Sequence, residues 1–256
     1  MAEKEKLQFR LTNNMKNILT KIRYDLKQKV DLKHRDGERK FFKEKIKNYG
    51  VKTPVVRQIA RKYFQEIENL EKSKIFDLCE ELLKSGYTEE ATIAFQWAFQ
   101  IKDQYQKQDF KLFEEWLKKY VSNWGKCDDF CTHTFGYFIF KFPEFLPKLN
   151  LWARLSARQE KSKNRWLKRA SAVILIYPIK QDKKFLNKIF EISDILLLDQ
   201  DDLVQKGYGW LLKEASNIYQ KQVFDFVMQN KNTMPRTALR YAIEKMPASF
   251  RKKAML

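Results

Sequence analysis

Apolar residues recur at spacings of three and four along most of this chain, and this periodicity limits the fold more than any other feature. The clearest series are Ala91, Ala94, Phe95, Ala98, Ile101 and Trp166, Ala170, Val173, Ile174, Tyr177. Such spacing places the apolar side chains on one face of a helix. Strand-like alternation is almost absent, and 7 Gly and 6 Pro in 256 residues leave little material for hairpins or glycine-rich phosphate loops. We therefore expect an all-α protein.

Residues with capping side chains predict where several of the helices begin. Thr53 followed by Pro54 indicates a helix with a hydroxyl cap and a proline in its first turn. Thr88 before two glutamates indicates a second such start, and Ser162 and Asp201 are predicted to precede two more.

A weak internal repeat suggests how the helices are arranged. Lys206 follows Arg169 by 37 residues, and Arg240 follows 34 residues later, each within a similar helical segment. A period of this size is typical of stacked two-helix units of the HEAT type. We expect one α-solenoid domain over 1–256 whose equivalent helices line a concave basic groove.

The formal net charge of +19, from 51 Lys and Arg against 32 Asp and Glu, indicates a polyanionic partner. Nucleic acid is the first candidate, and an anionic membrane surface is the second. No apolar run approaches the ~20 residues needed to span a bilayer, and the N-terminus carries acids rather than a secretory signal. Three cysteines are too few for a disulfide framework, which suits a reducing cytosol.

The charge is unevenly distributed along the sequence. Residues 1–62 hold 19 basic and 7 acidic residues, whereas residues 63–104 hold 4 and 9. A second basic cluster, residues 148–169, has eight basic residues and one acid. We interpret these clusters as basic faces that meet a polyanion; a solvated helical face is the alternative.

The segment around Asp128 combines an acid with an indole on one helical face. In a helix that begins near Ser122, Trp124, Cys127, Asp128 and Cys131 share a face, whereas Asp129 points about 100° away. A carboxylate in a basic, aromatic-rich surface is a plausible place for chemistry on a polyanion, because it can stabilise developing positive charge. The alternative is a surface acid paired to Lys126 or to a neighbouring arginine.

Tryptophans divide into two predicted groups. Trp97, Trp116 and Trp152 are expected in the core. Trp210 differs because Lys206 and Lys213 share its helical face, which indicates a wet groove where an indole can stack on a base or lie against a sugar.

Cys127, Cys131 and His133 raise the question of a zinc site. A fourth ligand would have to come from Cys79 or His34, and no Cys-x-x-Cys pair is present. His133 lies on another helical face than Cys127, so the sequence gives no local Cys-His nucleophile. We expect buried thiols, no metal and no cofactor.

Four motifs together resemble the AlkD-type DNA alkylation repair family over about residues 35–245. They are Tyr49-Gly-Val-Lys-Thr-Pro-Val-Val-Arg57, Trp124-Gly-Lys-Cys-Asp128, Asn164-Arg-Trp-Leu-Lys-Arg169-Ala and Val204-Gln-Lys-Gly-Tyr-Gly-Trp210. The resemblance implies a right-handed α-solenoid of HEAT-like repeats over 35–245, with a basic concave groove for duplex DNA. The preceding segment, 1–34, is expected to be basic and helical and falls largely outside the resemblance.

The resemblance also implies an activity, which is hydrolysis of the N-glycosidic bond of cationic alkylated purines such as N3-methyladenine and N7-methylguanine. Asp128 matches the family's catalytic aspartate, Arg169 its phosphate-contacting arginine, and Trp124 and Trp210 the indoles that cradle the deoxyribose. The DNA-contacting residues are expected to be Lys52, Thr53, Arg57, Arg165, Lys168, Lys206, Lys213 and Arg240. This chain departs from the family pattern at Lys52, where a glutamine is expected, and at Phe41, where a tyrosine is expected.

The expected partner is double-stranded DNA with alkylated bases, bound by a monomer in the cytoplasm near the nucleoid, with no membrane association. Two other interpretations stay open. The first is a non-catalytic HEAT-repeat binder of damaged or branched DNA, in which Asp128 is only a structural acid. The second is a protein-binding solenoid, which the net charge of +19 disfavours.

Overall fold

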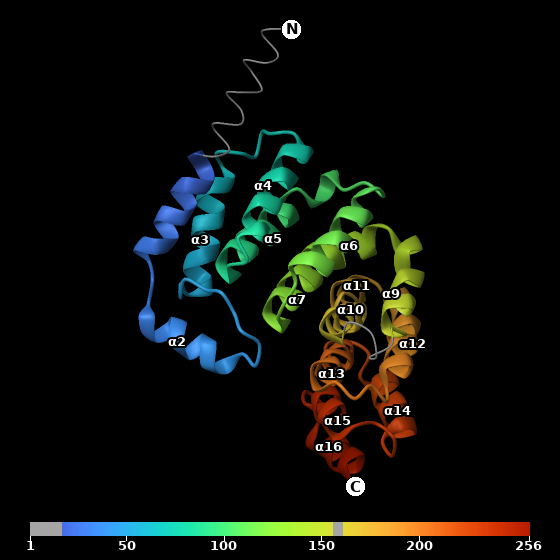
Figure 1. The fold of residues 1–256 in the computed structure, drawn as a ribbon. Helices are drawn as coiled ribbons and strands as arrows, with labels where there is room; N and C mark the ends of the chain where they lie inside the picture. Colours follow the sequence, from blue (N-terminus) through green and yellow to red (C-terminus); the bar gives the residue numbers. More distant parts are fainter. Residues whose placement is uncertain (1–16, 156–160) are drawn as a thin grey trace. The chain divides into compact units, whose positions relative to one another are not determined.

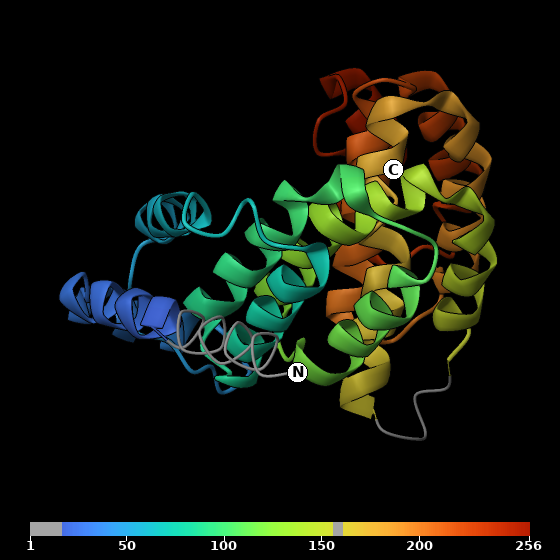
Figure 2. The same cartoon turned by 90° about the horizontal axis from the view of Figure 1, so that it is seen from above.

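A computed structural model of the protein describes residues 17–155 and 161–256, without the side chains of residues 161–163. Helices joined by short connections make up these ranges (Figure 1 and Figure 2), and an isolated bridge between Lys47 and Tyr87 is the one β element within them. The all-α helical-repeat fold is confirmed. Among the described helices, none combines the length and the apolar character that a bilayer crossing needs.

Contacts within the chain separate it into two compact units, Met1–Gln104 and Tyr105–Leu256. The described helices of the first unit are 17–28, α2 (Leu32–Phe41), α3 (Thr53–Phe64), α4 (Lys72–Lys84), α5 (Thr88–Gln100) and the 3₁₀ turn η1 (Lys102–Gln104). In this unit α5 packs on both α3 and α4. The expected single domain over 1–256 stays a prediction.

The second unit is a series of helix pairs. Its helices are α6 (Asp109–Tyr120), α7 (Trp124–Phe130), α8 (Gly136–Lys141), α9 (Leu146–Ala153), α10 (Lys161–Val173), α11 (Ile176–Gln181), α12 (Leu186–Leu196), α13 (Asp202–Ser216), α14 (Gln220–Asn230), α15 (Arg236–Ile243) and α16 (Ala248–Met255). Short helical segments η2 (Cys131–Phe135), η3 (Pro143–Phe145) and η4 (Lys183–Phe185) connect some of them.

Equivalent helices of these pairs stack side by side, as the repeat predicted. Helix α10 packs against α7 and α13, and α13 packs against α15, while α9 packs against α12 in a second layer. Figure 1 shows α10, α13 and α15 following one another in the first layer, with α9, α12 and α14 beside them. The repeat therefore brings residues of α7, α10 and α13 into one row.

The core is rich in aromatic side chains. Trp97, Trp116 and Trp152 are at most 4% exposed, which confirms their predicted place in the core. Phe113 and Phe135 contact each other with their ring centroids 5.7 Å apart, within a larger group of rings that α6, η2, α8 and α9 supply. Burial of many such rings stabilises the stacked helices.

The predicted helix caps are right at Asp201 and wrong at two threonines. Asp201 caps α13, and its side chain accepts a hydrogen bond from the backbone N–H of Leu203 at 3.0 Å. Thr53 is the first helical residue rather than the cap of α3, because the extended backbone of Lys52 ends the preceding segment. The Thr88 hydroxyl donates instead to the carbonyl of Lys47 across the β bridge.

Ser162 lies within α10, which already includes Lys161, so the prediction that it precedes this helix is wrong. The predicted basic helical segment 1–34 lies partly outside the described residues: residues 17–28 are helical, and residues 1–16 are not described.

Candidate active site

A short helix, α7, presents Asp128. Asn123 caps this helix, and its side-chain oxygen accepts a hydrogen bond from the backbone N–H of Lys126 at 2.9 Å, so the helix begins at Trp124 rather than at Ser122. Cys127 is completely buried and fixes the inner face of the helix. Asp128 follows it and keeps 17% of its side chain exposed. The carboxylate is therefore anchored but still open to solvent.

The chain widens into a π-helical segment, η2, directly after α7. The hydroxyl of Thr132 donates to the backbone carbonyl of Asp128 at 2.7 Å, and so satisfies an acceptor at the end of the α-helical ladder. Single π turns are frequent at functional sites. Here the segment carries the chain away from Asp128 without covering its carboxylate completely.

Arg169, on α10, grips both oxygens of the Asp128 carboxylate. Its Nε donates to Oδ1 and its Nη2 donates to Oδ2, each at 2.8 Å, which is the two-pronged geometry of the strongest Arg–carboxylate pairs. Nη1 donates to the backbone carbonyl of Leu203. Gly207 leaves room for the arginine, because a Cβ there would lie 3.2 Å from Arg169 Cγ. Three helices thus fix one ion pair.

The expectation that Arg169 contacts a DNA phosphate stays a prediction. Arginine has five N–H donors, and Asp128 and Leu203 accept from three of those of Arg169. Two donors are left for another acceptor. In the structure, the side-on pair of donors faces Asp128.

Burial and Arg169 act on the pKa of Asp128 in opposite directions. Burial raises this pKa, the hydrogen bonds and charge of Arg169 lower it, and the charge of Asp129 raises it, so that it lies above its ordinary value of 3.8. Burial lowers the pKa of Arg169, but the hydrogen bonds and charge of Asp128, together with Cys127 and Cys131, raise it, so that it lies above its ordinary value. Because the guanidinium stays charged and donates to both oxygens, we infer that the carboxylate is ionised near neutral pH.

Trp124 and Trp210 are both partly exposed, unlike the core tryptophans. Trp124 begins α7, one turn before Asp128. Trp210 lies on α13, where its indole Nε1 donates to Glu214 Oε1 at 3.1 Å. Both tryptophans therefore stay partly accessible in the same stack of helices that carries the ion pair.

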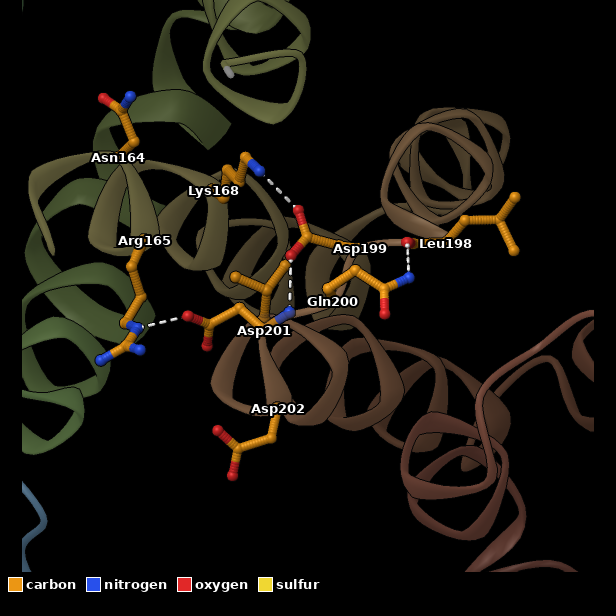
Figure 3. Close-up of a pocket in the computed structure, with 9 residues that line it drawn as sticks. Asn164, Arg165, Lys168, Leu198, Asp199, Gln200, Asp201 and Asp202 are labelled. Carbon is orange, nitrogen blue, oxygen red and sulfur yellow. Dashed lines mark hydrogen bonds and ion pairs between the residues drawn. The ribbon is translucent and has the colours of Figure 1, made fainter. Parts of the chain in front are cut away.

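The predicted DNA-contacting cations of the second unit differ in how available they are. Lys168 is 8% exposed and pairs with Asp199 at 2.6 Å. Arg165 is half-buried and pairs with Asp201. Figure 3 shows both pairs reaching from α10 to the loop before α13, at a pocket of about 440 Å³. These two cations therefore tie the loop to α10, and the loop leads directly into Leu203.

The remaining predicted cations of this unit differ in exposure, and the Lys213 side chain is only 15% exposed. Lys206 pairs with Asp202 at 3.2 Å on α13 itself, and Lys213 pairs with Glu244 at 3.1 Å. Arg240, on α15, is exposed. The Lys206–Asp202 pair is an exposed ion pair, and such pairs exchange readily for other partners, because they contribute only about 0–1 kcal/mol each.

Three predicted contacts belong to the first unit, at the start of α3. Lys52 keeps 64% of its side chain exposed and lies 3.4 Å from the carboxylate of Asp31. Thr53 is exposed and Arg57 is half-buried. These residues form a polar helix start that the structure leaves accessible.

The thiols and the histidine do not assemble into a metal site. Cys127 and Cys131 are fully buried, and burial raises the pKa of Cys131 well above its ordinary value. His133 is exposed, and its ring Nδ1 lies 3.0 Å from the backbone carbonyl of Asp129. Within the residues that the structure describes, no group of three or more His, Cys, Asp or Glu is placed to hold a metal ion.

Sequence reasoning missed two participants in the site. The carbonyl of Leu203 holds Arg169, but a backbone acceptor leaves no mark on side-chain composition. Glu214 lies four residues after Trp210, and this spacing on a helix could have revealed their contact.

The fold and the site define a helical-repeat protein with a carboxylate–guanidinium pair in a row of stacked helices. Residues 22–246 match the family model described as DNA alkylation repair enzyme. The chain therefore belongs to the DNA alkylation repair enzyme family.

A solved structure titled "Predicted DNA alkylation repair enzyme from Enterococcus faecalis" resembles the chain with a TM-score of 0.71. The match covers 86% of this chain and 98% of that one at 13% sequence identity, so it shows a shared fold. None of the curated proteins matches the chain by sequence.

Proposed function

We propose that this protein is a DNA glycosylase that hydrolyses the N-glycosidic bond of cationic alkylated purines, such as N3-methyladenine and N7-methylguanine, in duplex DNA. The observation that carries the proposal is the Asp128 carboxylate, which Arg169 grips through both oxygens while 17% of the side chain stays exposed. Membership of the DNA alkylation repair enzyme family supports the same activity.

A single carboxylate is sufficient for this reaction. Ordinary glycoside hydrolysis uses two carboxyl groups because the leaving oxygen must be protonated. An N-alkylated purine already carries a positive charge, so it takes the electrons of the C1′–N bond and leaves as a neutral base. The sugar is left as an oxocarbenium-like cation, which the Asp128 carboxylate stabilises. Water then adds to C1′ and loses a proton, and Asp128 orients this water.

Neighbouring groups hold the DNA around that carboxylate. Trp124 and Trp210 lie against the deoxyribose and exclude bulk water, and Arg169 offers its two remaining donors to a phosphate. The exposed predicted cations, among them Lys52 and Arg240, bind further phosphates. Binding through ~6 to 10 phosphates weakens steeply as salt rises.

The reaction requires no cofactor, and one chain carries all the residues named here. We propose that the protein acts as a monomer in the cytoplasm, where it meets the nucleoid. The net charge of +19 supports an encounter with DNA that is steered by electrostatic attraction.

Incubation of the purified protein with methylated duplex DNA tests this function directly. We expect free N7-methylguanine and N3-methyladenine, identified by chromatography and mass spectrometry, in amounts above those released from the same DNA without protein. Binding of the duplex without any released purine would overturn the proposal in favour of a non-catalytic binder of damaged or branched DNA.

A further inference from the structure

The indole of Trp210 is anchored by two side chains that the reaction outlined above does not use. Trp210 Nε1 donates to Glu214 Oε1 at 3.1 Å, and the other oxygen of Glu214 lies 2.6 Å from Lys180 Nζ. Trp210 and Glu214 are one helical turn apart on α13, and Lys180 lies near the end of α11. Because α11 packs against α13, a second helix supports the contact.

The charge on Glu214 is well supported. Its side chain is 18% exposed, whereas that of Lys180 is 47% exposed. Burial raises the pKa of Glu214, but Lys180, Trp210 and Lys213 together lower it by a larger amount. The pKa of Glu214 therefore lies below its ordinary value. The acceptor of the indole N–H is thus a carboxylate, and charge-assisted hydrogen bonds are stronger than neutral ones.

We propose that Glu214 is a positioning residue that fixes the ring of Trp210 for contact with the sugar of the lesion. The inference rests on the proposed glycosylase function. An indole has one N–H donor, and without a partner on the protein this donor would turn toward water or a DNA oxygen. Anchored to Glu214, the ring keeps one orientation, and its face stays available to the deoxyribose.

The negative charge of Glu214 has a second effect, on the ring itself. The face of an indole attracts cations, and tryptophan does so more strongly than other aromatic residues. A carboxylate that accepts the N–H hydrogen bond polarises this bond and shifts electron density onto the indole ring, so that the ring face becomes more negative. This favours the oxocarbenium-like sugar over the neutral ground state, which is the condition for faster chemistry. Lys180 neutralises Glu214 on its other side, so the carboxylate does not repel DNA phosphates.

Two substitutions at Glu214 and one matched control separate positioning from simple stability. Glu214→Gln keeps an oxygen acceptor but loses the charge, and Glu214→Ala loses both. Asp225→Ala removes a carboxylate from a surface pair with Lys221 on α14, so it changes the net charge by the same amount. For each protein we would record the Trp210 indole N–H resonance, assigned with Trp210→Phe, and the single-turnover release of N7-methylguanine at saturating DNA.

In Glu214→Ala we expect the indole resonance to move and the rate of purine release to fall about tenfold, because small errors in positioning slow a reaction by factors of this order. Glu214→Gln should lie between Glu214→Ala and the wild type, and Asp225→Ala should match the wild type. An unchanged indole resonance in Glu214→Ala would overturn the positioning role whether or not the protein is a glycosylase. A wild type that releases no purine would overturn the glycosylase function alone, because the resonance still decides the anchoring.

Discussion

Two acidic doublets, Glu89-Glu90 in the first unit and Asp128-Asp129 in the second, look alike in the sequence but have different surroundings. Glu90 is completely buried, and it accepts hydrogen bonds from Arg23 and from the hydroxyl of Tyr49. Glu89 is 4% exposed. Asp128, in contrast, faces a single guanidinium and keeps an exposed edge.

Glu89 is fully occupied in shaping a loop. Its carboxylate accepts the backbone N–H groups of Tyr49, Gly50 and Val51 at 3.1, 2.7 and 3.0 Å. Gly50 has a φ of +96°, a conformation that side-chain-bearing residues rarely adopt. The glutamate therefore stabilises the loop that leads into α3.

The comparison shows what distinguishes a carboxylate for folding from one for chemistry. Backbone donors surround the carboxylate of Glu89 and leave it no access to a ligand. The carboxylate of Asp128 has one strong partner, Arg169, on one side only. Its other side can meet a developing positive charge. The two groups differ in burial and also in the direction of their hydrogen-bond donors.

Asp128→Asn should have the largest effect, because it removes the charge that stabilises the sugar cation. We expect release of N7-methylguanine to fall by at least about 100-fold, a typical loss when one electrostatic contact to a transition state is removed. Duplex binding, measured by fluorescence anisotropy, should be retained. Asp129→Asn is the matched control and should remain active. Full activity of Asp128→Asn would mean that Asp128, like Glu89 and Glu90, serves only the fold.

Glu89→Ala should affect the free energy of unfolding instead of the chemistry. Three N–H groups, two of them buried, would lose their acceptor, and we expect a loss of about 3 kcal/mol in chemical denaturation. Faster hydrogen exchange at Gly50 would locate the damage in the loop. At saturating DNA, the release of purine per folded molecule should match the wild type. Asp77→Ala, which removes an exposed acid paired with Lys74, should change stability by less than about 0.5 kcal/mol.

The sequence predicts one side of this comparison better than the other. Helical spacing predicts that Asp128 shares a face with Trp124 and Cys127, because this depends only on neighbours within about one turn. The grip of Arg169 on Asp128 joins residues 41 positions apart, and no local pattern encodes it. The resemblance predicts both residues as members of the site, with Arg169 in contact with a DNA phosphate.

The helix starts teach the same lesson on a smaller scale. Asp201 was predicted correctly because its cap contact lies two residues ahead on the same chain. Thr88 was wrong because a distant carbonyl, that of Lys47, takes its hydroxyl. A side chain that bonds a residue far away in the sequence cannot also cap its own helix, and the local sequence does not show that such a partner exists.

The pH dependence of purine release should report the setting of Asp128. The reaction needs the ionised carboxylate, and the pKa of Asp128 lies above 3.8, so activity should fall as the pH drops through that raised value. Asp129→Asn should move this acid limb to lower pH, because the charge of Asp129 raises the pKa of Asp128. Initial rates are measured between neutral and acidic pH, with release from protein-free DNA subtracted. If the acid limb of Asp129→Asn coincides with that of the wild type, the charge of Asp129 does not raise the pKa of Asp128.

A third doublet, Asp201-Asp202, gives the smallest and most specific test. Asp201 caps α13 and holds Arg165, as a structural acid should, whereas Asp202 pairs with Lys206 near the surface, where their side chains are 41% and 34% exposed. Asp202→Asn frees Lys206 for a phosphate, so we expect duplex affinity to rise about threefold at moderate salt and the salt dependence to steepen by about one phosphate contact.

Asp225→Asn frees Lys221 on α14 with the same change in net charge, and it separates a local from a global effect. We expect its affinity for the duplex to equal that of the wild type when both are titrated at several salt concentrations. Equal gains in the two variants would mean that DNA senses only the total charge. A gain confined to Asp202→Asn would mean that an exposed aspartate beside the site competes with phosphate for a particular lysine, a role that neither Glu89 nor Asp128 can play because their donors lie within the fold.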